Sequence, residues 1–420
     1  MEEGYRMDSV RTVRLLMSSL SVYRGVNDRS ASKAFYRLLC AEDASPDEFV
    51  SAWGAFYSLL AERGYTENFL YCMTKAALFD ENAFSRACCA KKDGELPKGL
   101  ADAARRDIDA IFRIGRTTPQ DILGAYRRAD ELGEAADLLP RWSVGKSVPE
   151  LSGSDPMSGL SQYYQANGFG TFARYRAFIW RDKSLYPVQY PDSITISSLT
   201  GYEIPRAKVV DNTTAFLHGC GCNNVLLYGD RGTGKSSTVK AILNEYWGDG
   251  LRMVEMPKDK LAEFPLLVER IAPLPLKFII FIDDLSFNED DKSYAWLKAV
   301  LEGGLAVRPD NTLIYATSNR RHLIKENFSD RSGDELHRND TIQETLSLSD
   351  RFGLSVLFGK PDKAQYIDII KNLAQEKGIA FDEELLAQAE SFAISRGGRS
   401  PRCARQFIAA HEAAALNKNE

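Results

Sequence analysis

The residues best suited to chemistry lie in the run GDRGTGKSS, which fits the spacing Gly-x-x-x-x-Gly-Lys-[Ser/Thr]. An apolar run precedes it and a helical pattern follows it, and a phosphate-binding loop needs both flanks. Glycines let the backbone curl until successive N–H groups face phosphate oxygens. The sequence predicts a triphosphate-binding loop made of Gly229, Asp230, Arg231, Gly232, Thr233, Gly234, Lys235, Ser236 and Ser237.

Within this loop, Lys235 would supply a positive charge to the β- and γ-phosphates, and Ser236 would offer a hydroxyl to Mg²⁺. Two acids, Asp283 and Asp284, follow the apolar run FIIFI. We expect that run to be a buried strand beside the strand that feeds the loop, with Asp283 holding Mg²⁺ through water and Asp284 orienting the attacking water. An acidic turn at a strand end is the structural alternative, and the phosphate loop upstream favours the metal site.

The elements that must position these residues follow from the apolar pattern. Short apolar runs begin at residues 225, 252, 278, 313 and 354, and helical patterns lie between them at 236–246, 261–271 and 296–301. Such alternation is typical of a parallel sheet covered by helices on both faces. The predicted fold class is therefore α/β, with an αβα core that binds a nucleotide.

The segments on either side of the core are predicted to be mostly helical. Residues 1–143 predict an all-helical N-terminal domain, and residues 144–185, rich in Ser, Gly and Pro, predict a linker. The core is expected at 186–360. Three further helical patterns, which glycines separate, predict a small helical lid at 361–420.

Three more motifs resemble those of AAA+ ATPases. LIYATSN ends at Asn319, which resembles the polar sensor near the γ-phosphate, and LSLSDRFGL carries Arg351 in a setting similar to an arginine finger. GGRSPRCARQF carries Arg402, similar to the second sensor on the lid. The resemblance covers about residues 190–416, and the longer strings NNVLLYGDRGTGKSS, IIFIDDLSF and SLSDRFGL look like the bacterial family called domain of unknown function 815.

This resemblance implies binding of ATP with Mg²⁺ and hydrolysis at the interfaces of a homo-oligomer, where Arg351 reaches the neighbouring subunit's ATP. It also implies that the segment 199–202, with Tyr202, lies across the adenine. One departure is Asp284, because most AAA+ proteins have Glu there. An aspartate is one methylene shorter, so its carboxylate would lie about 1.5 Å further from the water if the backbone stayed in place. Slow hydrolysis follows as an expectation.

Composition sets further bounds. The chain has 420 residues, 44% of them hydrophobic, with a net charge of -5 and seven cysteines. Its first 25 residues mix acids and bases, so a cytoplasmic protein with reduced thiols and no membrane partner is expected. The run from His218 to Cys222 lacks a second pair of zinc ligands and is interpreted as a Gly-rich turn.

Three functions stay open on the sequence. The first is an ATP-driven switch or remodeller whose N-terminal helical domain receives an unidentified protein partner. The second is a slow or non-hydrolysing ATP-dependent scaffold, which Asp284 favours. The third is a DNA-associated loader or remodeller, based on the cluster from Arg320 to Lys325, although interleaved acids make a solvated mixed-charge face the simpler interpretation.

Overall fold

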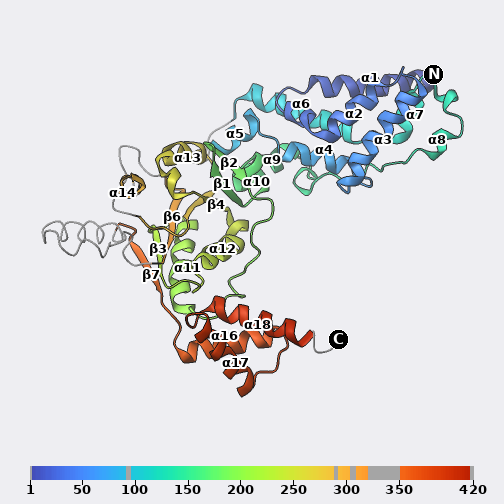
Figure 1. Ribbon diagram of the computed structural model, residues 1–420. Helices are drawn as coiled ribbons and strands as arrows, with labels where there is room; N and C mark the ends of the chain where they lie inside the picture. Colours follow the sequence, from blue (N-terminus) through green and yellow to red (C-terminus); the bar gives the residue numbers. More distant parts are fainter. Residues whose placement is uncertain (1, 91–95, 288–291, 303–308, 320–350, 417–420) are drawn as a thin grey trace. The chain divides into compact units, whose positions relative to one another are not determined.

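The chain folds into two compact units. The computed structural model describes residues 2–90, 96–287, 292–302, 309–319 and 351–416. The first unit is Met1–Arg174 and the second is Tyr175–Glu420 (Figure 1). The division falls inside the range 144–185, for which the sequence predicts a linker.

The described residues of the first unit form helices. Apolar faces of these helices build an interior rich in aromatic rings, with Trp53, Phe56 and Phe69 fully buried. Helix α3 begins at Pro46, because the Ser45 hydroxyl and the Glu48 carboxylate form a reciprocal cap with the first-turn backbone. The helices are α1 (Glu2–Ser19), η1 (Arg24–Asp28), α2 (Ser30–Cys40), α3 (Pro46–Glu62), α4 (Phe69–Leu78), α5 (Ala83–Ala90), α6 (Lys98–Gly115), α7 (Pro119–Ala125), η2 (Ala129–Leu132), α8 (Ala135–Leu138), η3 (Pro149–Leu151), α9 (Pro156–Asn167) and α10 (Gly170–Arg174).

The range predicted as a linker is largely ordered. Helix α9 buries Leu160 and Tyr164 in the first unit, and strand β1 buries Trp180 in the second. Its glycines and prolines mark turns between short elements and helix starts, such as Pro156 at the first turn of α9. Composition alone does not separate such turns from a flexible connection, because the same residue types serve both.

The second unit is built on a mixed sheet whose described strands have the order β2-β1-β4-β5-β6-β3-β7. All neighbours pair in parallel except β1 and β2, which form an antiparallel hairpin at one edge. The parallel αβα core is thus confirmed, and the hairpin is an addition to the prediction. The strands are β1 (Ala177–Arg181), β2 (Ser184–Pro187), β3 (Val225–Gly229), β4 (Leu251–Glu255), β5 (Lys277–Ile282), β6 (Thr312–Ser318) and β7 (Leu354–Phe358).

Helices cover both faces of the sheet (Figure 1). Val209 and Phe216 of α11 and Ile242 of α12 share one core with alternate residues of the central strands. In Figure 1, α13 and α14 lie on the opposite face from α11 and α12. These elements are α11 (Glu203–Leu217), α12 (Lys235–Tyr246), η4 (Trp247–Asp249), η5 (Lys258–Glu263), α13 (Phe264–Ile271) and α14 (Lys292–Glu302).

The strand order corrects one prediction about the site. Strand β5, which carries the two acids, does not lie beside β3, because β6 pairs with both of them. In register, Tyr228 of β3 lies opposite Ser318 of β6, and Ile282 of β5 lies opposite Ala316. Carboxyl ends of parallel strands meet at one edge of the sheet, so the phosphate loop, Asn319 and the two acids still converge there.

The lid is a bundle of three helices, α16 (Lys363–Glu376), α17 (Glu383–Ser395) and α18 (Pro401–Leu416), as the sequence predicts. Apolar residues of all three helices form a separate small core. Before α18, the Arg399 guanidinium donates to both carboxylate oxygens of Glu390 on α17. Paired bonds of this kind fix direction as well as distance, so this ion pair orients the segment that leads to Arg402.

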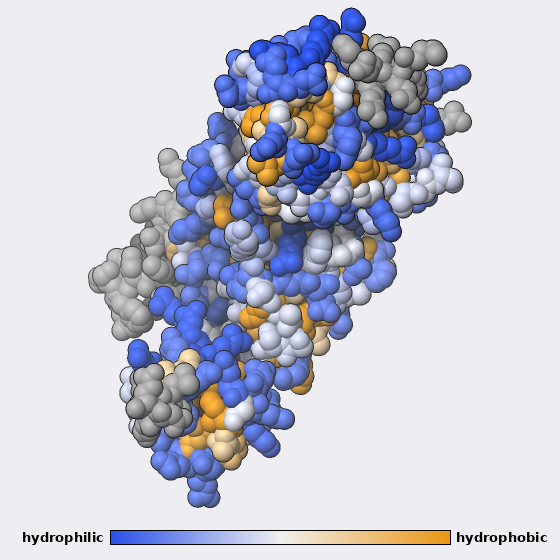
Figure 2. All heavy atoms as spheres, turned by 90° about the vertical axis from the view of Figure 1, so that its right-hand side faces the viewer, coloured by the Kyte–Doolittle hydropathy of each residue, from blue (hydrophilic) through white to orange (hydrophobic). Residues whose placement is uncertain are grey.

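The surface is mostly hydrophilic on the face that Figure 2 draws, with apolar residues in separate patches. Among the residues that the structure describes, no helix is both long enough and apolar enough to cross a bilayer.

Candidate functional site

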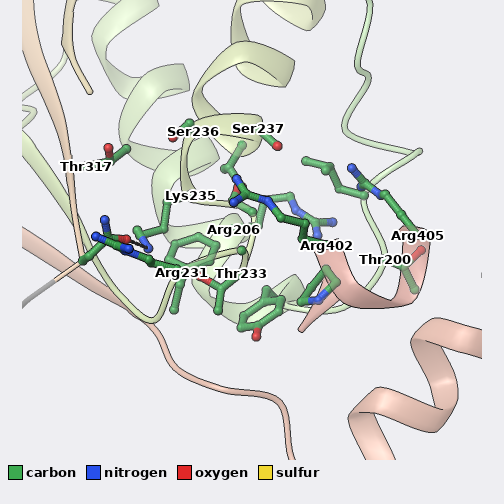
Figure 3. Close-up of a pocket in the computed structure, with 18 of the residues that line it drawn as sticks. Thr200, Arg206, Arg231, Thr233, Lys235, Ser236, Ser237, Thr317, Arg402 and Arg405 are labelled. Atoms are coloured by element: carbon green, nitrogen blue, oxygen red, sulfur yellow. Dashed lines mark hydrogen bonds between the residues drawn. The ribbon is translucent and has the colours of Figure 1, made fainter. Parts of the chain in front are cut away.

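A cavity of about 610 Å³ opens at the carboxyl edge of the sheet, between the core and the lid. Its volume lies within the range of small-molecule sites. Figure 3 shows Lys235, Ser236 and Thr317 on one side of the cavity, and Arg402 and Arg405 entering it from α18. The lining residues also include Leu199, Thr200, Tyr202, Arg206, Arg231, Gly232, Thr233, Gly234, Ser237, Thr238, Asp283, Asp284, Asn319, Phe358, Pro401 and Gln406.

The predicted phosphate loop runs from β3 into α12 and forms the floor of this cavity. Gly229 has φ +132°, and Gly234, which caps α12, has φ +93°. The loop is also tied to β7, since the Asp230 N–H donates to the Phe358 carbonyl over 3.1 Å. The Asp230 carboxylate also accepts a hydrogen bond from the Lys360 N–H, just after β7, over 3.1 Å. The loop is therefore held in shape by the neighbouring strand and the chain that follows it.

Replacement of Gly229 by alanine is expected to destabilise the second unit. A Cβ there would clash with the Phe358 carbonyl oxygen, in a backbone conformation that side chains rarely adopt. We expect a loss of about 2 kcal/mol or more and a melting temperature lower by at least about 4 °C. Gly219→Ala is the matched control, because its φ is +71° but its Cβ would meet open space. Equal melting temperatures for both variants would contradict this account of the loop.

Lys235 lies at the centre of the loop and is only 7% exposed. Its Nζ donates to the carbonyls of Gly229 and Asp230 over 2.9 and 2.7 Å, and to Asn319 Oδ1 over 3.2 Å. Burial lowers the pKa of this ammonium group, against the opposing effect of nearby acids led by Asp230. These three acceptors are neutral oxygens, and a partly desolvated ammonium group interacts strongly with an anion.

The oxygens of Ser236 and Asp283 meet where the sequence predicts a metal. Ser236 Oγ donates to Asp283 Oδ1 over 2.6 Å, and the Thr317 hydroxyl donates to the same carboxylate oxygen. A hydroxyl and a carboxylate that line the same cavity are hard oxygen donors of the kind that Mg²⁺ takes together with phosphate oxygens. The donor set therefore fits Mg²⁺.

Asp284 and Asn319 are brought into contact from two neighbouring strands. Asn319 Nδ2 donates to Asp284 Oδ1 over 2.6 Å, so one amide group links the second acid to Lys235. The backbone N–H of Asp284 donates to Thr317 Oγ1 over 2.9 Å, and the residue has φ +51°. The sequence reasoning missed Thr317, because its role depends on β6 lying beside β5.

The segment 199–202, which the resemblance places across the adenine, contributes to the lining of the cavity. Leu199, Thr200 and Tyr202 line it, as expected for a base-binding segment. Tyr202 stacks on Phe358 at 5.5 Å, and its hydroxyl donates to the Gly359 carbonyl over 2.6 Å. Burial, with Asp230 as the second cause, raises the pKa of Tyr202 to about 12, so its hydroxyl stays neutral.

Three arginines surround the cavity in addition to Arg231. Arg402, predicted as the lid sensor, lines it, and its N–H donates to the Gly232 carbonyl over 3.2 Å. The sequence reasoning missed Arg405 and Arg206. Helical spacing could have identified both. Arg405 is three residues after Arg402, and Arg206 is four residues after Tyr202, so each shares a helix face with a predicted residue. The pKa of Arg206 is lowered by burial.

Arg351 lies elsewhere. It precedes β7, whose first residue Leu354 is opposite Val225 at the start of β3, whereas the phosphate loop follows the end of β3. Arg351 is thus at the opposite edge of the sheet from the cavity and is not among its described lining residues. The basic cluster from Arg320 to Lys325, and Arg331 and Arg338, lie outside the described residues.

No curated protein matches the chain. Similar solved structures include a mutant of Thermotoga maritima RuvB (16% identity, TM-score 0.37, 54% of this chain and 67% of that one). Another is AMPPCP-bound DnaA from Aquifex aeolicus (16% identity, TM-score 0.37, 52% and 64%). A third is the FIGL-1 AAA domain with ADP (18% identity, TM-score 0.33, 52% and 73%).

The family model described as protein of unknown function (DUF815) matches residues 173–415, which is more than half of the chain. The match spans the described sheet, the residues that line the cavity and most of the lid. The chain belongs to the DUF815 family.

Proposed function

We propose that the protein is an ATPase that binds ATP with Mg²⁺ in the cavity between core and lid and hydrolyses it at the interfaces of a homo-oligomer. The observation that carries this proposal is the convergence of side chains from three strand ends. Lys235 contacts Asn319, Asn319 contacts Asp284, and Ser236 contacts Asp283. Phosphate binding alone needs only the loop, whereas hydrolysis needs an acid and a polar sensor beside it.

The residues take distinct roles in this proposal. The N–H groups of the loop and Lys235 hold the phosphates, and Arg402 adds positive charge from the lid. Ser236 and Asp283 would hold Mg²⁺, which supplies charge neutralisation on the phosphate oxygens. Asp284 accepts a proton from the attacking water and fixes its direction, while Asn319 keeps the Asp284 carboxylate in place.

The position of Arg351 supports a site completed by a second subunit. Five paired residues separate the two edges of the sheet along β3 and β7, which is roughly 13–17 Å of strand at about 3.3 Å per residue. An arginine side chain at the far edge does not span that distance to its own cavity. A neighbour's ATP is therefore the better target for it, as the motif predicts.

Arg351→Ala is expected to lower the turnover number at least about 100-fold while leaving ATP affinity within about threefold, because a finger acts on transition-state charge. The specific activity of the wild-type protein should also rise with protein concentration. Sedimentation in ATP and steady-state turnover across a dilution series measure both. A monomer in ATP with constant specific activity would remove the interface from the proposal.

A slow or non-hydrolysing ATP-dependent scaffold is the second candidate, and Asp284 in place of glutamate is the observation that favours it. Radiolabelled ATP distinguishes the two, since a scaffold should turn over less than about once per minute, well below usual enzyme rates. In either case the helical first unit is proposed to receive a protein partner.

A further inference from the structure

The turn after β5 is fixed by one residue of the neighbouring strand. The N–H groups of Asp284 and Leu285 donate to the hydroxyl and the carbonyl of Thr317, over 2.9 and 2.7 Å. Thr317 is 2% exposed and lies in register opposite Leu227 of β3. Leu285 is fully buried, so the chain has to turn inward directly after the acids. The two bonds from consecutive N–H groups hold that turn in one shape.

The turn places Asp284 in the left-handed region, with φ +51°. Aspartate and asparagine adopt this region several times more readily than most other side chains. A left-handed residue at the end of a strand also directs its Cβ away from the direction that an extended residue would give it. The expectation that the Asp284 carboxylate lies too far from the water compares side-chain lengths alone, whereas the left-handed backbone of Asp284 also sets the direction of its side chain.

We propose that Thr317 is a positioning residue for hydrolysis: its hydroxyl fixes the left-handed backbone at Asp284 and so makes aspartate, rather than glutamate, the acid that fits this site. This inference rests on the proposed ATPase function. The short contact between Asp284 and Asn319 supports it, because the carboxylate already reaches the sensor over 2.6 Å. A glutamate on the same backbone would carry the carboxylate one methylene beyond that contact.

The test compares Thr317→Val, Thr317→Ser and Asp284→Glu in the full chain. Valine keeps the size of the side chain and the hydrogen bond from the Leu285 N–H to the backbone carbonyl, but it removes the hydroxyl. Serine restores the hydroxyl. We expect Thr317→Val to lower kcat at least about tenfold with KM within about threefold, and Thr317→Ser to stay within about threefold of the wild type. Asp284→Glu is expected to lower kcat, although glutamate is the more common residue in AAA+ proteins.

A double-mutant cycle separates positioning from general structure. If Thr317 acts through Asp284, Thr317→Val should have almost no further effect on residual single-turnover hydrolysis when Asp284 is already Asn. Additive effects, or an Asp284→Glu variant as active as the wild type, would overturn the inference. If Thr317→Val fails to fold, the comparison of Asp284→Glu with the wild type still tests the inference.

An inactive wild-type protein that still binds ATP overturns the ATPase proposal and this inference together. An active wild type whose Thr317→Val variant keeps its kcat overturns only the inference.

Discussion

Lys235→Ala should weaken ATP binding at least about 100-fold, which corresponds to about 2.7 kcal/mol. The side chain is buried in the phosphate loop, and its Nζ is held by two backbone carbonyls and Asn319 Oδ1. Alanine removes the positive charge that we propose for contact with the phosphates. Titration of the wild type and the variant with ATP, followed calorimetrically, measures the difference.

Lys240→Ala is the matched control for this prediction. Lys240 lies on the same helix, but its side chain is 43% exposed and pairs with Asp192 over 3.6 Å. Exposed pairs of this kind contribute little to stability, so this variant should bind ATP like the wild type. Equal ATP affinity of Lys235→Ala and Lys240→Ala would place the nucleotide outside the loop.

Asp284→Asn should retain ATP but lose hydrolysis by a factor of about 10² to 10⁴, the usual contribution of a positioned general base. Asparagine has the same size, adopts the left-handed backbone and can still bond Asn319 after a flip of its amide. It cannot accept a proton. Phosphate release under single-turnover conditions measures the effect. A variant that traps bound nucleotide is also the best choice for capturing a protein partner of the first unit.

Asp259→Asn serves as its control, because Asp259 is on η5, is 69% exposed and does not line the cavity. Its hydrolysis should match the wild type. Undiminished phosphate release by Asp284→Asn would assign the general base to another group.

The central strands could be predicted because most of their residues are apolar and buried, as in the run of β5, although β7 exposes alternate residues. The β1-β2 hairpin could not, since its turn residues Asp182 and Lys183 both have positive φ without being glycine. Turns of that type are recognised in sequences chiefly by Gly or Asn. The edge hairpin also lies in a range whose Ser, Gly and Pro content suggests a linker.

Some residues of the site could likewise be predicted from the sequence, and others could not. The phosphate loop is a local motif, so its residues follow from spacing alone. The role of Thr317 depends instead on which strand lies beside β5, and chain order does not set that. The expected effect of Asp284 rests on side-chain length alone, whereas the structure adds a backbone conformation that changes where that side chain points.

The most direct test of the central claim is turnover of ATP by the wild-type protein, with and without Mg²⁺, alongside Lys235→Ala. The account predicts saturable phosphate release that requires Mg²⁺ and disappears in the variant. Phosphate release that persists in Lys235→Ala, or none from a wild type that also fails to bind ATP, would contradict it.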